Sequence, residues 1–355
     1  MTTAASLPAV APAARERTRH LLIALGTPLL GTFIGLLIGA IMIVLAGDDP
    51  LVIYQTMFLG AFGGGRQLTE TILQASPYLL IALGLTAAFR ARVWNIGAEG
   101  QYYMGALAAG ATALLLPGVP GYFMIPIMMV LGAAGGAVWA FIPGILKTRR
   151  GINEIISTLM LNYIAILLVQ YMARGPLQDP QGFLPQSAQL VNADRLPLLF
   201  GSRIHLGVLI AFLFVPIIYL LLWRTPLGFW LRAVGSRASV VRYAGVNVDR
   251  MILFAITFSG ALAGLAGILA VSGDGFRLKG DISNGYGFDG VLIALLGRMH
   301  PVGVMVAAIF FAALTVGAQA MSVVSQLPAS LASAIQAVVV LSVLATDAAV
   351  HRGRD

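Results

Sequence analysis

Apolar runs long enough to cross a bilayer recur along almost the whole chain. A membrane-spanning helix needs about 20 predominantly apolar residues. Runs of this kind lie near residues 21–46, 68–89, 96–116, 122–146, 152–172, 206–223, 251–272, 286–299, 301–321 and 329–346. The pattern predicts an all-α polytopic membrane protein with about ten transmembrane helices. The run at 286–299 is short for a full crossing and could instead form a half-helix or a re-entrant segment.

Composition supports this class and excludes others. Hydrophobic residues make up 59% of the 355 residues and charged residues 10%, whereas soluble domains carry roughly 25% charged residues. The chain has no cysteine, so it contains no disulfide or thiolate metal site. Its four histidines are scattered without ligand spacing, so we expect no metal site. The net charge of +8 does not indicate a nucleic-acid partner, because the basic residues lie at the ends of apolar runs.

The distribution of these basic residues predicts the topology. Most Lys and Arg residues fall in alternate loops, as the positive-inside rule expects for cytoplasmic loops. Both termini are then cytoplasmic. We expect a tail at 1–20, a transmembrane domain at 21–346 and a second tail at 347–355. The run at 21–46 is longer than a signal-peptide core and is interpreted as a retained first helix.

Two loops are unusually long. The extracytoplasmic loop at 174–205 is rich in Pro, Gln and Asp, and is either a docking surface or a plain connector. In the cytoplasmic loop at 225–250, apolar residues from Leu231 onward recur at helical spacing with arginines between them. This spacing predicts a short amphipathic helix, which either lies on lipid headgroups or inserts into a groove on a cytoplasmic partner.

Two polar, glycine-flanked segments interrupt the apolar pattern. Trp94–Gln101 contains Gly97-Ala98-Glu99-Gly100, which is similar to Gly287-Phe288-Asp289-Gly290, and each segment opens an apolar run. The spans before them run in opposite senses. This arrangement is typical of a 5+5 inverted repeat, in which broken helices meet near the middle of the membrane.

No motif for catalysis is present. The chain lacks a nucleophile elbow, a zinc-protease motif and a Walker-type phosphate loop, so we do not expect it to hydrolyse ATP. Within the spans Glu99, Glu154 and Asp289 are the candidate carboxylates, and none pairs with an embedded His or Lys as a proton relay would require. Glu154 is interpreted as a structural helix-start residue.

The polar segments predict a solute path. Glu99 is either a helix-start carboxylate favoured by the helix dipole or an acceptor for the solute. Asn162 either bonds a neighbouring helix or contacts the solute. The aromatic residues either belong to the interfacial belt or stack on a flat ligand. The candidate path residues are Trp94, Asn95, Glu99, Gln101, Tyr102, Asn162, Tyr286, Phe288 and Asp289.

Several segments together resemble the permease subunits of nucleoside-type ABC importers, within the ribose/galactose and branched-chain amino-acid permease superfamily. The segments are 95–101, 151–163, 225–235 with 244–248, 259–267, 287–290, and 296–297 with 301–303. Arg298-Met299-His300 departs from the pattern, because many members have a Gly-rich turn there.

The resemblance implies partners and a location. Such a permease sits in the bacterial cytoplasmic (inner) membrane and pairs with a second, paralogous permease. An ATPase with two nucleotide-binding modules holds ATP and Mg, and an extracytoplasmic protein delivers the solute. The 231–245 segment would be the coupling helix, contacting the ATPase through Leu231, Arg232, Arg237, Val241, Arg242, Tyr243 and Gly245. This chain itself would be no enzyme and would bind no cofactor.

We therefore expect nucleosides, meaning purine or pyrimidine ribosides, as the solute. One alternative is an ABC permease for a simple sugar such as ribose or galactose. The other is a secondary carrier that works alone, and a stable ATPase partner would refute it.

Overall fold

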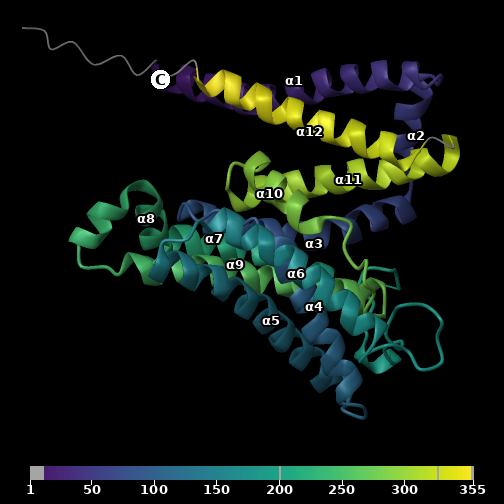
Figure 1. Ribbon diagram of the computed structural model, residues 1–355. Helices are drawn as coiled ribbons and strands as arrows, with labels where there is room; N and C mark the ends of the chain where they lie inside the picture. Colours follow the sequence, from purple (N-terminus) through teal and green to yellow (C-terminus); the bar gives the residue numbers. More distant parts are fainter. Residues whose placement is uncertain (1–11, 200, 326–327, 353–355) are drawn as a thin grey trace, which may run out of the picture. The chain divides into compact units, whose positions relative to one another are not determined.

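The computed structural model describes residues 12–352, apart from 200, 326 and 327 (Figure 1). These residues are mostly helical. The helices are α1 (Pro12–Leu45), α2 (Pro50–Phe62), α3 (Gly65–Arg90), α4 (Ala98–Leu115), α5 (Gly121–Arg150), α6 (Glu154–Arg174), α7 (Leu206–Arg224), α8 (Pro226–Tyr243), α9 (Val248–Ile268), α10 (Tyr286–Leu296), α11 (Pro301–Ser325) and α12 (Ala329–Arg352), with a π-helical turn, η2, at Leu269–Asp274 and a 3₁₀ turn, η1, at Asn192–Asp194. The predicted all-α class is confirmed.

Seven of these helices are long and apolar enough to cross a membrane, and the bent pair α1–α2 makes an eighth among the described residues. The two remaining predicted spans are α4 and α10, which both begin at a polar segment. Helix α10 has 11 residues, roughly 16 Å at 1.5 Å per residue, against a hydrocarbon core of about 30 Å. It therefore has the length of a half-helix, as the short run at 286–299 allowed.

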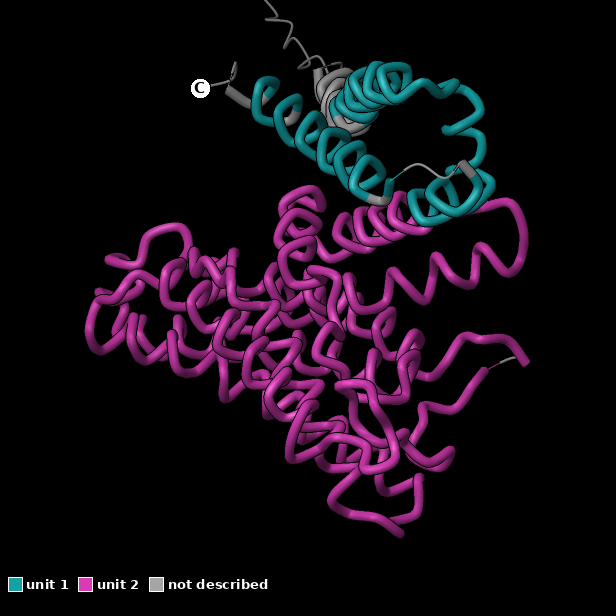
Figure 2. Tube along the Cα trace, turned by 45° about the vertical axis from the view of Figure 1, so that its right-hand side comes forward, with its two compact units in different colours: residues 1–60, 317–355 teal, residues 61–316 magenta. Residues whose placement is uncertain are grey.

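The chain divides into two compact units (Figure 2). Unit 1 comprises residues 1–60 and 317–355, and its centre is the pairing of α1 with α12. Glycines on α1 permit this close pairing, since a Cβ at Gly31 or Gly35 would overlap the backbone of Val343 or Val339. Small residues of this kind let membrane helices approach closely. The hydroxyl of Tyr54 on α2 donates to the Leu36 carbonyl at 2.6 Å and fixes the bend.

Unit 2 comprises residues 61–316 and is built around α3. In the spanning part of α3, 83% of the residues are buried, compared with 22% in α5 and 28% in α6. Helix α3 packs against α7, α9 and α10, while α4 packs against α5, α6 and α9. A helix that is apolar all round belongs inside a bundle. Unit 2 therefore encloses α3, and the polar segments at the starts of α4 and α10 lie next to it.

Two features differ from the sequence prediction. Helix α2 lies between the first two predicted spans, where no element was expected. The predicted single helix near 231–245 begins earlier, at Pro226, and bends at Arg237, whose backbone has φ −149° and ψ 95°. Thr225 caps its start, because its hydroxyl accepts a hydrogen bond from the Gly228 amide at 3.1 Å. Pro226 thus ends α7 and begins α8, since proline fits the first turn of a helix.

Candidate functional site

The segment between α3 and α4 is irregular and partly buried, and side-chain amides bond its buried end. Asn95 is fully buried. Its Oδ1 accepts hydrogen bonds from the Gly97 amide at 3.0 Å and from the Gln101 side chain at 2.9 Å. Its Nδ2 donates to Gln101 Oε1 at 2.8 Å and to Ser259 Oγ on α9 at 3.1 Å. Irregular backbone at membrane depth requires such partners, so this network holds the break between α3 and α4 in place.

Asn162 on α6 supports the same break from the other side. Its Oδ1 accepts from the Gly100 amide at 2.8 Å, and its Nδ2 donates to the Ile96 carbonyl at 2.9 Å. Asn162 therefore bonds a neighbouring helix, which was one of the two roles considered for it.

The two polar segments meet through Glu99 and Gly287. Glu99 is almost fully buried in the first turn of α4, and its Oε2 accepts a hydrogen bond from the Gly287 amide at 2.6 Å. A Cβ at Gly287 would overlap the backbone of Ala98 and Glu99. The N-termini of α4 and α10 thus adjoin, and one carboxylate faces both. Because each helix N-terminus carries partial positive charge, Glu99 stabilises the pair electrostatically.

Asp289 attaches α10 to α3. Its Oδ2 accepts a hydrogen bond from the Tyr78 hydroxyl at 3.0 Å. The Tyr78 ring packs against Tyr286 at 5.0 Å and against Phe311 at 5.5 Å between centroids. The start of α10 is therefore held by a carboxylate contact and by an aromatic cluster.

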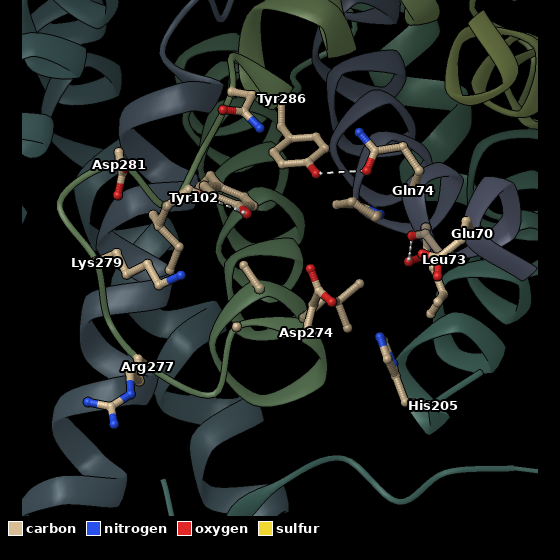
Figure 3. Close-up of a pocket in the computed structure, with 17 residues that line it drawn as sticks. Glu70, Leu73, Gln74, Tyr102, His205, Asp274, Arg277, Lys279, Asp281 and Tyr286 are labelled. Carbon is tan, nitrogen blue, oxygen red and sulfur yellow. Dashed lines mark hydrogen bonds between the residues drawn. The ribbon is translucent and has the colours of Figure 1, made fainter. Parts of the chain in front are cut away.

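A polar cavity of about 200 Å³ lies beside these helix starts (Figure 3). Its walls come from α3, α4, α10, η2, His205 and the loop from 275 to 285. Of the predicted path residues, Tyr102 and Tyr286 line it, and their ring centroids are 5.6 Å apart. The lining also includes Glu70, Gln74, Ser76, Asp274, Lys279, Asp281 and Asn284, none of which was predicted. Gln74 could have been found, because a glutamine inside the apolar run 68–89 is a signal of the same kind as Asn162.

Trp94 and Phe288 do not line this cavity, and both are partly exposed. The Trp94 ring packs against Phe89 at 4.9 Å, and its backbone amide donates to Glu154 at 3.4 Å. Glu154 also pairs with Lys147 at 2.5 Å. This ion pair supports the structural interpretation of Glu154, while the side chain of Asn153 caps α6 by accepting from the Ile155 amide at 2.9 Å.

The outer wall of the cavity is bonded to the long loop at 175–205. The Arg277 guanidinium donates to Asp179 at 3.0 Å and to the Ser187 carbonyl at 3.1 Å. Hydrogen bonds from the Gln181 amide and from Arg277 lower the pKa of Asp179 below its ordinary value. Asp179 is therefore ionised at neutral pH, and the attachment is intact.

His205, on the opposite wall, is a buried neutral side chain. Burial lowers the pKa of His205, and the nearby Asp274 offsets part of this effect. Its Nδ1 is buried without a hydrogen-bond partner among the described residues. Burial in this wall of the cavity therefore favours the neutral imidazole of His205 at pH 7.

At the opposite end of unit 2, α8 presents an exposed tip (Figure 1). Leu231 and Val241 are buried on its inner face, whereas Arg237, Arg242 and Tyr243 are exposed. Gly245, with φ +82°, lies in the turn after the helix. The predicted coupling residues thus divide into a buried and an exposed set, and the kink at Arg237 places the arginines beside solvent.

Arg232 is directed towards the permease itself. Its guanidinium lies 5.8 Å from the centroid of the Trp223 ring, and Arg90 lies 5.2 Å from the same ring. Trp223 also packs against His300 at 5.0 Å. Arg90 donates to the Met299 carbonyl at 3.0 Å. This cluster links α8 to the turn between α10 and α11.

The family model described as "Branched-chain amino acid transport system / permease component" matches residues 67–344. The chain belongs to this permease family. It is 36% identical over 343 residues to a glucose ABC transporter permease of Haloferax volcanii, covering 94% of this chain and 90% of that protein. It is 36% identical over 338 residues to a guanosine ABC transporter permease of Bacillus subtilis, covering 94% and 95%. It is 32% identical over 319 residues to a nucleoside ABC transporter permease of Lactococcus lactis, covering 86% of each. No solved structure matches the permease.

Membership of this permease family agrees with the structure described above. The permease is a multi-pass membrane protein whose broken helices meet at Glu99 and Gly287, and a polar cavity lies beside them. These features place hydrogen-bonding groups where an unbroken apolar bundle would have none.

Proposed function

We propose that this permease translocates nucleosides, as the membrane subunit of an ATP-driven importer. The observation that carries the proposal is its likeness, over nearly the whole chain, to a guanosine and to a nucleoside permease. The tyrosine-lined cavity supports it, since flat purine and pyrimidine rings pack well on aromatic side chains.

The permease would work with three partners. A second, paralogous permease would complete the path. Bacillus subtilis has two guanosine permease proteins similar to this chain, at 36% and 26% identity, which supports a heterodimer. A cytoplasmic ATPase with two nucleotide-binding modules would hold ATP and Mg, and this chain would bind no cofactor. An extracytoplasmic protein would deliver the solute.

The orientation we propose has both termini in the cytoplasm and about ten helices in the membrane of a bacterial cell, with α4 and α10 as broken elements. The permease domain would cover 21–346, between the tails at 1–20 and 347–355. The loop at 174–205 would face the binding protein and offers the exposed apolar side chains Phe183 and Leu184. The loop at 225–250 would face the ATPase through the tip of α8.

Alternating access would start at that tip. Closure of the ATPase on ATP would press on Arg237, Arg242 and Tyr243. The push would reach α3 because a Cβ at Gly235 would overlap the carbonyl of Arg90, so α8 and the end of α3 are in direct contact. Arg90 bonds the turn after α10, and α10 carries the groups that face the path.

Uptake of labelled guanosine and uridine tests the proposal. The complete importer in proteoliposomes should accumulate both nucleosides only with ATP, and unlabelled nucleosides should compete. Glucose and ribose should not compete at equal excess. Uptake of sugar without nucleoside would refute the nucleoside assignment and leave the permease role intact.

A further inference from the structure

The side chains of Gln74 and Tyr286 face each other in the polar cavity (Figure 3). Gln74 comes from α3 and Tyr286 from the first turn of α10. The Tyr286 hydroxyl donates to Gln74 Oε1 at 3.1 Å. This bond fixes the orientation of the amide. Among the described residues no hydrogen bond uses the Gln74 nitrogen, so its N–H groups are free for a ligand.

Tyr286 is itself held rigidly. Its ring packs against Tyr78 at 5.0 Å and against Tyr102 at 5.6 Å. Tyr286 on α10 and Tyr102 on α4 thus form an aromatic wall of the cavity, and Tyr78 on α3 supports Tyr286 from outside the cavity lining. A rigid aromatic wall beside an oriented amide is suited to a planar heterocycle, which stacks on the ring and hydrogen-bonds along its edge.

The size of the cavity decides which part of a nucleoside it takes. Its volume is about 200 Å³, whereas pockets for complete drug-sized ligands span roughly 300–1,000 Å³. The cavity therefore has room for the base, with the sugar at the rim. Asp274, Lys279 and Asp281 line that rim and supply acceptors and donors for sugar hydroxyls.

We propose that Gln74 and Tyr286 form a base-recognition pocket in the permease, in which Tyr286 stacks on the nucleobase and Gln74 pairs with its edge. This inference rests on the proposed nucleoside function and adds selectivity beyond that of the binding protein. Gln74 is the specificity-determining residue, and the Tyr286 hydroxyl positions it.

Maximal uptake rates of guanosine and adenosine, measured with saturating binding protein, test the pocket. Saturation removes the affinity of the binding protein from the comparison. The variant Gln74→Glu converts the amide to an acceptor-only carboxylate, which can pair with the N–H edge of guanine and not with the acceptor N7 of adenine. The guanosine-to-adenosine rate ratio should rise about tenfold, as expected for one bidentate base contact.

Two further variants separate recognition from folding. Gln74→Leu should lower both rates about tenfold with an unchanged amount of assembled complex. Tyr286→Phe keeps the aromatic ring but removes the hydroxyl that orients the Gln74 amide. It should therefore lower both uptake rates less than Gln74→Leu does and weaken the discrimination between guanosine and adenosine. Gln67→Leu is the matched control, because Gln67 lies on α3 outside the cavity lining and should leave rates and ratio as in the wild type.

The outcomes distinguish the two proposals. If the wild-type importer takes up no nucleoside, the proposed function fails and the pocket fails with it. If it takes up nucleosides while the Gln74 and Tyr286 variants match the Gln67→Leu control in rates and ratio, the pocket alone is refuted.

Discussion

At the residue scale, two carboxyl side chains inside unit 2, Glu99 and Asp289, each hold the start of a helix. Glu99 accepts from Gly287 at 2.6 Å, and Asp289 accepts from Tyr78 at 3.0 Å. Carboxylates inside a membrane cost about 2.5–3.5 kcal/mol each on insertion scales. The structure shows part of the compensation, because two helix N-termini face Glu99.

The double variant Glu99→Ala with Asp289→Ala should lower uptake at least tenfold. It removes both acceptors, so the start of α10 loses its attachment to α4 and to α3. Uptake per assembled complex is the measurement, and Asp48→Ala in the turn after α1 is the control. Transport at the wild-type rate would show that these carboxylates are not needed for the path.

His205 makes the stability of the permease depend on pH. Burial lowers its folded pKa below the ordinary 6.5, so the unfolded chain binds more protons as pH falls through that value. Stability contributed by the neutral form is present above pH 6.5 and is lost as pH falls towards the folded pKa. The melting temperature in detergent should therefore drop less between pH 7 and pH 5 in His205→Gln than in the wild type. Equal drops would show that His205 is not the responsible group.

Residue patterns in the sequence predicted some of the polar residues inside unit 2 and not others. Asn95, Glu99 and Asp289 were found because a polar residue in an apolar run is conspicuous. The contact between Glu99 and Gly287 joins residues that are distant in the sequence, and similarity of the two short segments was the only signal for it. The sequence does not single out Gln74, because a single glutamine in a 22-residue apolar run has the pattern of a satisfied interior residue, and its partner Tyr286 is distant in the sequence.

At the element scale, hydropathy predicted most helices close to their observed bounds, because twenty apolar residues in lipid can satisfy their backbone only as a helix. It did not predict the bend of α8 at Arg237, since the spacing of apolar residues is the same on both sides of it. That bend depends on tertiary contacts. Val234 and Val241 pack with Val248 into one small core beneath the tip.

The exposed tip of α8 should couple ATP hydrolysis to transport. Changing Arg237 and Arg242 to Glu reverses two exposed charges and leaves Leu231 and Val241 buried. Uptake should fall at least tenfold while the permease still inserts and the ATPase still hydrolyses ATP. The ratio of solute transported to ATP hydrolysed measures this effect.

Arg66→Glu is the matched control for that experiment, because Arg66 is also exposed but lies at the other end of α3 from Arg90. It should leave the ratio unchanged. Full coupling in the double α8 variant would contradict an ATPase contact at this tip.

At the scale of the whole molecule, the absence of cysteine makes orientation directly measurable. Phe183 in the loop at 175–205 and Tyr243 at the tip of α8 are both almost fully exposed. The loop at 175–205 and the tip of α8 lie at opposite ends of unit 2 (Figure 1). A single cysteine at either position would be the only thiol in the chain, so a maleimide that cannot cross membranes reports its side without ambiguity.

In intact spheroplasts the Phe183→Cys variant should be labelled at once, and the Tyr243→Cys variant only after permeabilisation. The reason is the charge pattern, since the arginines of 225–250 belong on the cytoplasmic side. The cysteine-free wild type is the control for background labelling. The reverse pattern would turn the cavity towards the cytoplasm, and α8 could then not reach an ATPase. The same two variants therefore decide whether the base-recognition pocket faces the incoming solute and whether the tip of α8 faces the ATPase.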